Sequence, residues 1–181
     1  MEEAREEPEA AGAEEGEGDG KFMITCKFEN GHEVNNARHA VVDAILTRGN
    51  EILIVKRSAE MFQAGKYCLP GGFIEHDESV EEAAKREVRE ETGYETRVVK
   101  LLFIVDAPER NEAGRQNIAF VFLLEALKKT GAPDYEVSEV LWRKLDNLPP
   151  KKDFAFDHYR TILEYKKSLK QKNPLPRFLS K

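Results

Sequence analysis

The sequence lacks the marks of several protein classes. No run of 18 or more apolar residues occurs in the 181 residues, so we expect no membrane span. The N-terminus is acidic rather than basic and then apolar, so we expect no secretory signal and a cytoplasmic location. There are two cysteines, Cys26 and Cys68, and they do not have metal-site spacing. We expect them to be reduced thiols.

The chain also lacks a strong excess of positive charge. The net charge is −6, and residues 1–20 contain nine acidic residues and one basic residue, which leaves residues 21–181 near +2. A near-neutral domain gives no support for nucleic-acid binding through a basic patch. Residues 1–20 have almost no large apolar side chain, so we predict a disordered acidic tail whose simplest role is solubility.

Carboxylates are concentrated between residues 72 and 94. The segment GFIEHDESVEEAAKREVREETGY follows a Leu-Pro-Gly-Gly turn and places four glutamates on or just before one predicted helix: Glu78, Glu87, Glu90 and Glu91. Grouped carboxylates repel one another unless a cation lies among them, and such oxygen ligands suit Mg²⁺ or Mn²⁺. A divalent ion beside a glycine turn indicates phosphate chemistry.

Helix geometry points three of these glutamates toward the protein. With Glu87 as zero, Glu90 lies at roughly 300° and Glu91 at roughly 40° around the helix. The small apolar residues share this side, and the remaining charged residues form the opposite side: Glu81, Glu82, Lys85 and Arg89. An ordinary surface helix keeps its charges opposite the apolar stripe. The pattern therefore favours a functional site over a solvated helix.

The same segment resembles the Nudix box, a Gly followed at set spacing by Glu, Arg-Glu, Glu-Glu and Gly. The matching residues are Gly72, Glu78, Arg86, Glu87, Glu90, Glu91 and Gly93. Tyr94 departs from the pattern, since an aliphatic residue is usual there. The wider resemblance runs from about residue 37 to residue 165. It implies an α/β/α sandwich with a mixed central sheet, and Mg²⁺-dependent hydrolysis of a nucleoside diphosphate linked to another moiety.

The resemblance also implies roles for single residues. Glu87, Glu90 and Glu91 match the metal ligands of the family, and the carbonyl of Gly71 is a further expected ligand. Mg²⁺ is the expected ion, with Mn²⁺ as an alternative, because carboxylates accept both. For the general base, Glu139 matches a later acidic position of the family, Glu87 and Glu90 are rivals, and Glu139 could equally be a loop glutamate without a role.

The remaining candidates support these residues. Gly72, like Gly71, lets the backbone approach a phosphate without a colliding side chain. Glu78 either supports the metal shell through water or caps the helix. Arg86 lies four residues before Glu90 and is expected to pair with it. Arg57, at the end of a predicted strand, either meets a phosphate or is solvated.

The substrate is indicated by weaker resemblances. Pro108 lies fourteen residues after Tyr94, where Nudix enzymes acting on ADP-ribose tend to carry a proline. The segments around it and at FAFDHYRTILEY also look like microbial ADP-ribose pyrophosphatases. We therefore expect a small nucleotide substrate, first ADP-ribose, and a possible homodimer. The alternatives are an enzyme that clears nucleoside triphosphates or splits dinucleoside polyphosphates, and a non-catalytic ADP-ribose sensor.

Periodicity predicts strands and helices in alternation, an α/β (α+β) chain. HAVVDAILT and EILIVKR should be paired strands, TRVVKLLFIVDA, QNIAFVFLLEAL and SEVLWRKLDNL further strands, and residues 153–170 an amphipathic helix. The expected domain spans residues 21–172, and residues 173–181 are expected to be a loose end. Three aromatic residues could stack on a base, although core packing is expected for each: Phe62, Tyr67 and Phe156.

Overall fold

The computed structural model describes residues 25–35, 37–108, 110, 116–171 and 176–180. The predicted disordered tail, residues 1–20, lies outside them. The main sheet contains β3 (Ala40–Arg48), β4 (Glu51–Arg57), β5 (Tyr67–Cys68), β6 (Gly71–Phe73), β7 (Tyr94–Val105), β8 (Ile118–Lys129), β9 (Val137–Lys144) and β10 (Arg177–Phe178). The helices are α1 (Val80–Thr92), α2 (His158–Ser168) and a 3₁₀ turn, η1 (Lys151–Asp153).

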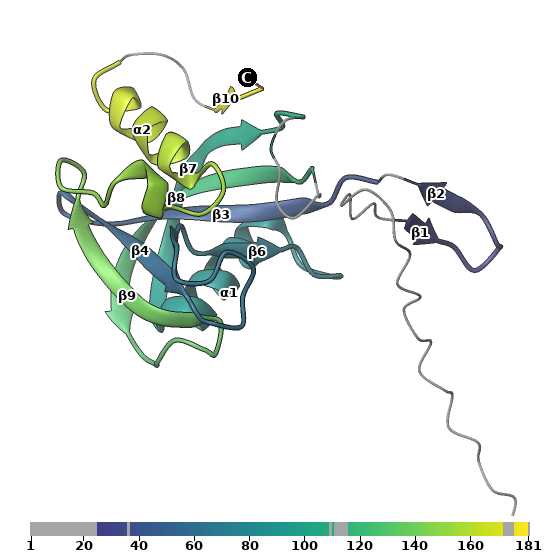
Figure 1. The fold of residues 1–181 in the computed structure, drawn as a ribbon, viewed down its shortest axis with the longest axis horizontal. Coiled ribbons are helices and arrows are strands. Elements are labelled where there is room, and N and C mark those ends of the chain that lie inside the picture. The colour runs from purple at the N-terminus through teal and green to yellow at the C-terminus, as the bar shows by residue number, and fades with distance from the viewer. Residues whose placement is uncertain (1–24, 36, 109, 111–115, 172–175, 181) are drawn as a thin grey trace, which may run out of the picture.

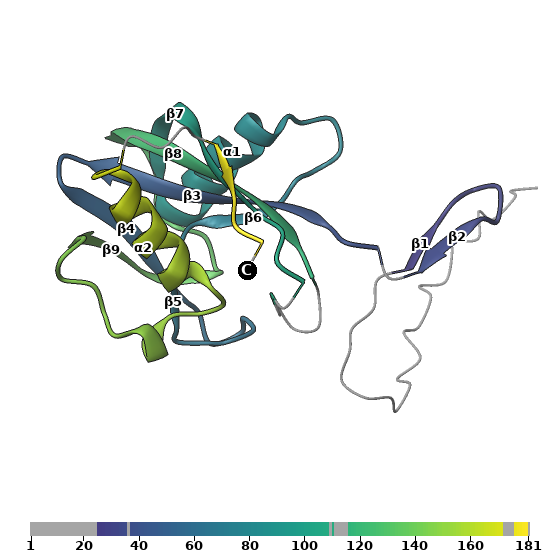
Figure 2. The ribbon, with the colours of Figure 1, turned by 90° about the horizontal axis from the view of Figure 1, so that it is seen from above.

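The main sheet is mixed, as predicted. Its strands follow the order β10-β7-β8-β3-β4-β5, while β6 pairs with β3 and β9 pairs with β4. The pairs β3–β8 and β7–β10 are parallel. The other pairs of this sheet are antiparallel. Helices α1 and α2 cover opposite faces of the sheet (Figures 1 and 2), which confirms the predicted α/β/α layers.

The central strands are apolar on both faces because a helix covers each face. In β3, Val41 and Ile45 join the cluster that contains Ile162 of α2. Their neighbours Val42 and Ala44 join the cluster that contains α1. Successive side chains point to opposite faces of a strand, so this one largely apolar strand supplies both cores. These strands also carry residues of the candidate site.

Two short turns join neighbouring strands, and the pairing predicted between residues 39–47 and 51–57 is present. The turn at Gly49 joins β3 to β4, although β3 then pairs mainly with β8 and β6. The turn at Asn30-Gly31 joins β1 (Thr25–Lys27) to β2 (Glu33–Asn35). This hairpin forms a separate two-stranded sheet and lies beside the main body rather than within it (Figures 1 and 2).

Two predictions near the C-terminus are wrong. The last helix begins at His158 instead of residue 153, because Phe156 has φ +55°, outside the helical region. The preceding residues are held in extended structure, where the Ala155 N–H donates to the Tyr67 carbonyl at 2.8 Å. The end of the chain is not entirely loose either, since β10 pairs in parallel with β7. No helix among the described residues is long and apolar enough to cross a membrane.

Candidate active site

Helix α1 is capped at both ends. Ser79 is the N-cap, and its exchange of hydrogen bonds with Glu82 completes a capping box. Gly93 ends the helix in the left-handed conformation, with φ +74°. The predicted outer side of the helix is exposed, and Ala83 and Ala84 are fully buried. The carboxylate side of α1 therefore faces the protein, as the helix geometry predicted.

Glu87 and Glu90 line a cavity of about 470 Å³ between α1, the turn before β6 and the start of α2. Glu91 lies deeper, is 5% exposed, and accepts a hydrogen bond from the Gly71 N–H at 3.1 Å. Gly72 also lines the cavity, so the structure brings the three expected metal-binding glutamates and both glycines to one place. Their roles as ligands stay predictions.

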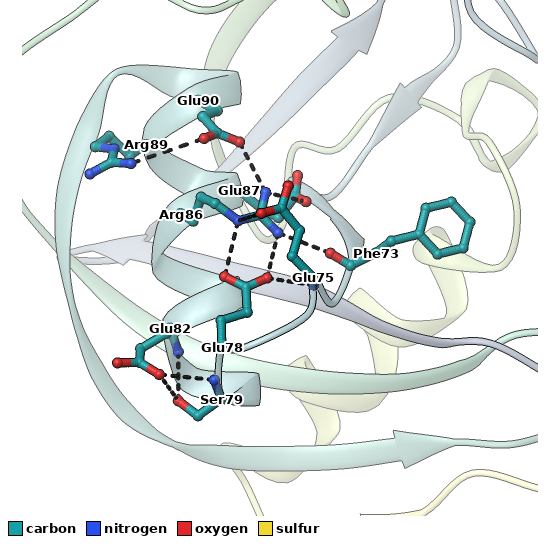
Figure 3. Close-up of polar contacts among 9 residues, drawn as sticks. All are labelled: Phe73, Glu75, Glu78, Ser79, Glu82, Arg86, Glu87, Arg89 and Glu90. Atoms are coloured by element: carbon teal, nitrogen blue, oxygen red, sulfur yellow. Dashed lines mark hydrogen bonds and ion pairs between the residues drawn. The ribbon is translucent and has the colours of Figure 1, made fainter. Parts of the chain in front are cut away.

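Arg86 links the acidic residues of this segment (Figure 3). Its Nη1 donates to Glu87 Oε1 at 2.9 Å and to Glu90 Oε2 at 3.0 Å, so the expected pair with Glu90 is present. Its Nη2 donates to Glu78 Oε1 at 2.7 Å and to the Phe73 carbonyl at 2.9 Å. Glu78 therefore does not cap α1; it holds Arg86 from the turn before the helix. One nitrogen touching two carboxylates shows that both can share a single cation.

The two glycines of the turn are needed for different reasons. A Cβ on Gly71 would lie 2.2 Å from the backbone oxygen of Val42, on the neighbouring strand. A Cβ on Gly72 would lie 2.5 Å from Glu87 Oε1. The sequence suggested that these glycines admit a phosphate. In the structure, Gly71 leaves room for the neighbouring strand, and Gly72 leaves room for the carboxylate of Glu87.

The buried carboxylates of Glu87 and Glu91 are not fully balanced by nearby positive charge. Burial raises the pKa of Glu87 to about 7, and Arg86 opposes the rise only in part. Burial raises the pKa of Glu91 well above its usual range, and the charge of Glu87 adds to the effect. Within the described part of the chain, no three His, Cys, Asp or Glu side chains converge as a ready metal site. The donor set is nevertheless suited to a hard divalent ion, because it consists of carboxylate oxygens and two of its three glutamates, Glu87 and Glu91, are largely buried.

A second group of charges, which sequence reasoning missed, forms another wall of the cavity. Asp43, in the middle of β3, accepts a hydrogen bond from Arg110 Nη2 at 3.1 Å. Arg110 Nε donates to Asp157 Oδ1 at 3.1 Å. His158 Nδ1 accepts from the Leu69 N–H at 2.9 Å, so its Nε2 carries the hydrogen and faces Asp43 Oδ1 at 3.5 Å. The available signal was a lone aspartate inside an apolar strand, since a buried charge needs a partner.

The structure does not bring Glu139, the expected late acid, to the cavity. Glu139 does not line the cavity: it lies on β9 opposite Lys56, with 3.9 Å between Lys56 Nζ and Glu139 Oε2. Glu136 and Asp134 line the cavity instead. Glu136 comes directly before β9, at the end of the loop that leads into this strand. The pairing of β4 with β9 is irregular here, with a register shift between Lys56 and Arg57.

The structure places one further candidate, Arg57, at the cavity and another, Pro108, away from it. Arg57 lines the cavity, and its Nε donates to the Phe62 carbonyl at 2.7 Å. Pro108 is exposed in the turn after β7 and is not among the residues that line the cavity.

Tyr67 packs against the core, as expected. Phe62 does not, because 49% of it is exposed.

Comparison with known proteins places these features in a family. Residues 37–165 match the model of the NUDIX domain. The chain is 39% identical over 124 residues to an ADP-ribose pyrophosphatase of Methanocaldococcus jannaschii, covering 68% of this chain and 70% of that protein. It is 32% identical over 106 residues to an 8-oxo-dGDP phosphatase of Danio rerio, covering 56% of this chain but only 31% of that protein.

Among solved structures, the fold is similar to that of a NUDIX hydrolase from Nitrosomonas europaea. The TM-score is 0.69 at 22% sequence identity, and the match covers 89% of this chain and 96% of the other. At this identity the likeness concerns the fold alone.

Proposed function

We propose that this chain, which belongs to the Nudix family and is a Nudix pyrophosphatase, hydrolyses ADP-ribose to AMP and ribose 5-phosphate with Mg²⁺ as its cofactor. The observation that carries the proposal is the shared contact of Arg86 Nη1 with Glu87 and Glu90 at the cavity. It brings two carboxylates together at the cavity, beside two glycines without side chains. The choice of ADP-ribose is supported by the archaeal relative of that name.

The proposed ligands of the ion are the carboxylates of Glu87, Glu90 and Glu91 with the carbonyl of Gly71. When bound, a divalent ion neutralises pyrophosphate charge and lowers the pKa of a coordinated water. Mn²⁺ is the alternative ion. Arg86 holds two of the carboxylates in place through its planar guanidinium, which can serve several acceptors at once.

Glu136 is the proposed general base, in place of Glu139. It lines the same cavity as Glu87 and adds to the rise of the pKa of Glu87, so the two carboxylates lie within electrostatic reach. The Tyr135 hydroxyl donates to Glu136 Oε1 at 3.2 Å and orients it. Glu87 and Glu90 remain rival bases. Arg57 is the proposed contact for a phosphate, because it brings a positive charge to the opposite side of this acidic cavity.

A second candidate function is removal of damaged or excess nucleoside phosphates. It is favoured by the 32% identity to the 8-oxo-dGDP phosphatase, although the chain covers only 31% of that protein. A non-catalytic ADP-ribose sensor is opposed by the complete set of box residues, since Glu87, Glu90 and Arg86 are all present at the cavity.

The test is product analysis with a panel of substrates. The full chain is incubated with Mg²⁺ and ADP-ribose, NADH, diadenosine tetraphosphate or 8-oxo-dGTP. The proposal expects the highest kcat/KM for ADP-ribose, with AMP and ribose 5-phosphate formed in equal amounts. Preferred cleavage of a triphosphate or a dinucleotide would replace the substrate but keep the metal site. Binding of ADP-ribose without turnover of any compound would support the sensor instead.

A further inference from the structure

Two phenylalanines meet at the edge of the acidic cavity, although they lie far apart in the sequence. Phe62 belongs to the loop after β4, and Phe156 to the segment that leads into α2. Their ring centroids are 6.3 Å apart, and their planes differ by 28°. Phe156 lines the cavity, as does Met61, the neighbour of Phe62. Phe156 also packs against the core cluster that contains α1, as expected, whereas Phe62 belongs to neither core cluster.

Phe156 is held in place from several sides. The guanidinium carbon of Arg57 lies 5.1 Å from its ring centroid, and the ring of His158 lies 5.2 Å away. Its backbone N–H donates to Gln63 Oε1 at 3.2 Å. These contacts cover Phe156, whereas Phe62 keeps 49% of its surface exposed. The pair therefore presents one aromatic surface, that of Phe62, backed by a fixed second ring.

The backbone on both sides of this pair adopts an unfavourable conformation. Gln63 has φ +58° and Phe156 has φ +55°, values that are uncommon for residues other than glycine. The hydrogen bond from Phe156 to Gln63 joins these two residues directly. Such conformations persist only where the surroundings enforce them, and they gather at sites that hold ligands. A simple surface loop would have no need for two of them in contact.

We infer that Phe62, backed by Phe156, is the surface on which the nucleobase of the substrate stacks. Stacking on an aromatic ring suits any base, because every base has a π-face. Arg57 connects this surface with the phosphate end: its Nε donates to the Phe62 carbonyl, its guanidinium lies over Phe156, and it lines the acidic cavity. The inference rests on the proposed function only in requiring a nucleotide as the substrate.

Two measurements on the full chain test this stacking surface. The first compares the steady-state kinetics of ADP-ribose hydrolysis for the parent, Phe62→Ala and Phe28→Ala. Phe28 is a matched control, since it is also an exposed phenylalanine, at 53%, but lies on the hairpin outside the main sheet. Loss of one stacked base raises KM by about 5- to 150-fold. We expect a rise in this range for Phe62→Ala with a much smaller change in kcat, and parental values for Phe28→Ala.

The second measurement needs no turnover. Phe62→Trp is titrated with AMP, ADP-ribose or ribose 5-phosphate in EDTA while tryptophan fluorescence is recorded. The chain has one native tryptophan, Trp142, which is not among the cavity-lining residues and whose indole N–H donates to the Tyr94 hydroxyl at 3.2 Å. We expect AMP and ADP-ribose to quench the fluorescence of the variant but not that of the parent, and ribose 5-phosphate to quench neither.

The results separate this inference from the proposed function. Quenching of Phe62→Trp by AMP supports the stacking surface even where ADP-ribose proves to be no substrate. A response to AMP no larger than the response to ribose 5-phosphate would overturn it. A parental KM for Phe62→Ala in an active enzyme would overturn it as well, whatever the preferred nucleotide.

Discussion

Adding one methyl group at Gly72 should disable the site while leaving the fold nearly intact. In Gly72→Ala, the new Cβ would lie 2.5 Å from Glu87 Oε1 and 2.7 Å from both Glu87 Cδ and Oε2. An ordinary contact is about 3.5 Å or longer, so the carboxylate must move by about 1 Å. The end of a glutamate side chain can make this movement at a cost of about 1 kcal/mol in rotamer energy. The same movement weakens the contact between Glu87 and Arg86, now 2.9 Å.

The functional cost should be much larger than the structural cost. A displacement of about 1 Å in a catalytic group reduces the rate by roughly 100-fold. We therefore expect Gly72→Ala to lower kcat/KM for ADP-ribose by roughly 100-fold and to require more Mg²⁺, with a loss of only about 1 kcal/mol in the free energy of unfolding.

The neighbouring glycine provides the contrast. A Cβ on Gly71 would lie 2.2 Å from the backbone oxygen of Val42, and a backbone cannot move as a side chain does. We expect Gly71→Ala to lower the free energy of unfolding by about 3 kcal/mol. Gly131→Ala is the control, because its Cβ would make only an ordinary contact of 3.8 Å with Gly93 Cα. Urea unfolding and steady-state kinetics on the three variants make the comparison.

The outcome that would refute this reasoning is specific. Gly72→Ala with the parental rate and the parental Mg²⁺ requirement would show that the position of the Glu87 carboxylate does not matter. A loss of stability in Gly72→Ala as large as that in Gly71→Ala would show that the two glycines serve the fold in the same way.

Three further predictions concern the charged groups of the site. Glu136→Gln should lower kcat by roughly 100-fold or more while Glu139→Gln stays within about twofold, and similar effects of both in steady-state assays would reject the assignment of the base. Arg86→Gln should lower the free energy of unfolding by roughly 2–3 kcal/mol in urea, because it leaves partly buried carboxylates without their cation; an unchanged midpoint would contradict this. Because the pKa of Glu87 is raised to about 7, the metal-free protein should lose stability as the pH rises from about 4.5 through 7, by up to about 3 kcal/mol from this residue. The melting temperature in EDTA should therefore fall less steeply with pH in Glu87→Gln than in the parent, Mg²⁺ should offset the fall in the parent, and equal slopes of parent and variant would exclude a raised pKa.

The local parts of the fold could be predicted because each depends on residues close in sequence. The capping box of Ser79 and Glu82, the stop at Gly93 and the inward side of α1 all follow from spacing within one helix. The pair of Arg86 and Glu90 is also a contact between adjacent helical turns. The alternation of strands and helices likewise follows from neighbouring residues, whereas the mixed sheet and its helical layers were implied by the resemblance to the Nudix family.

The missed parts depend on contacts between distant segments. Asp43, Arg110 and His158 come together only when β3, the loop after β7 and α2 are packed. No spacing pattern in the sequence predicts such a group of charged residues.

The acidic residues of the loop before β9 were also missed. Asp134 and Glu136 line the cavity, whereas Glu139 lies on β9 opposite Lys56. The short strand β10 was missed because two residues carry no periodicity.

The most direct test of the central claim is the Mg²⁺ dependence of ADP-ribose hydrolysis by the parent and by Glu90→Gln. Glu90 lines the cavity and shares Arg86 with Glu87, and its side chain is 42% exposed, so its amide should not disturb the fold. The account predicts saturable activation of the parent by Mg²⁺, and a variant with a higher requirement for Mg²⁺ and a rate lower by roughly 100-fold. Hydrolysis by Glu90→Gln at the parental rate and the parental Mg²⁺ concentration would contradict the proposed metal site.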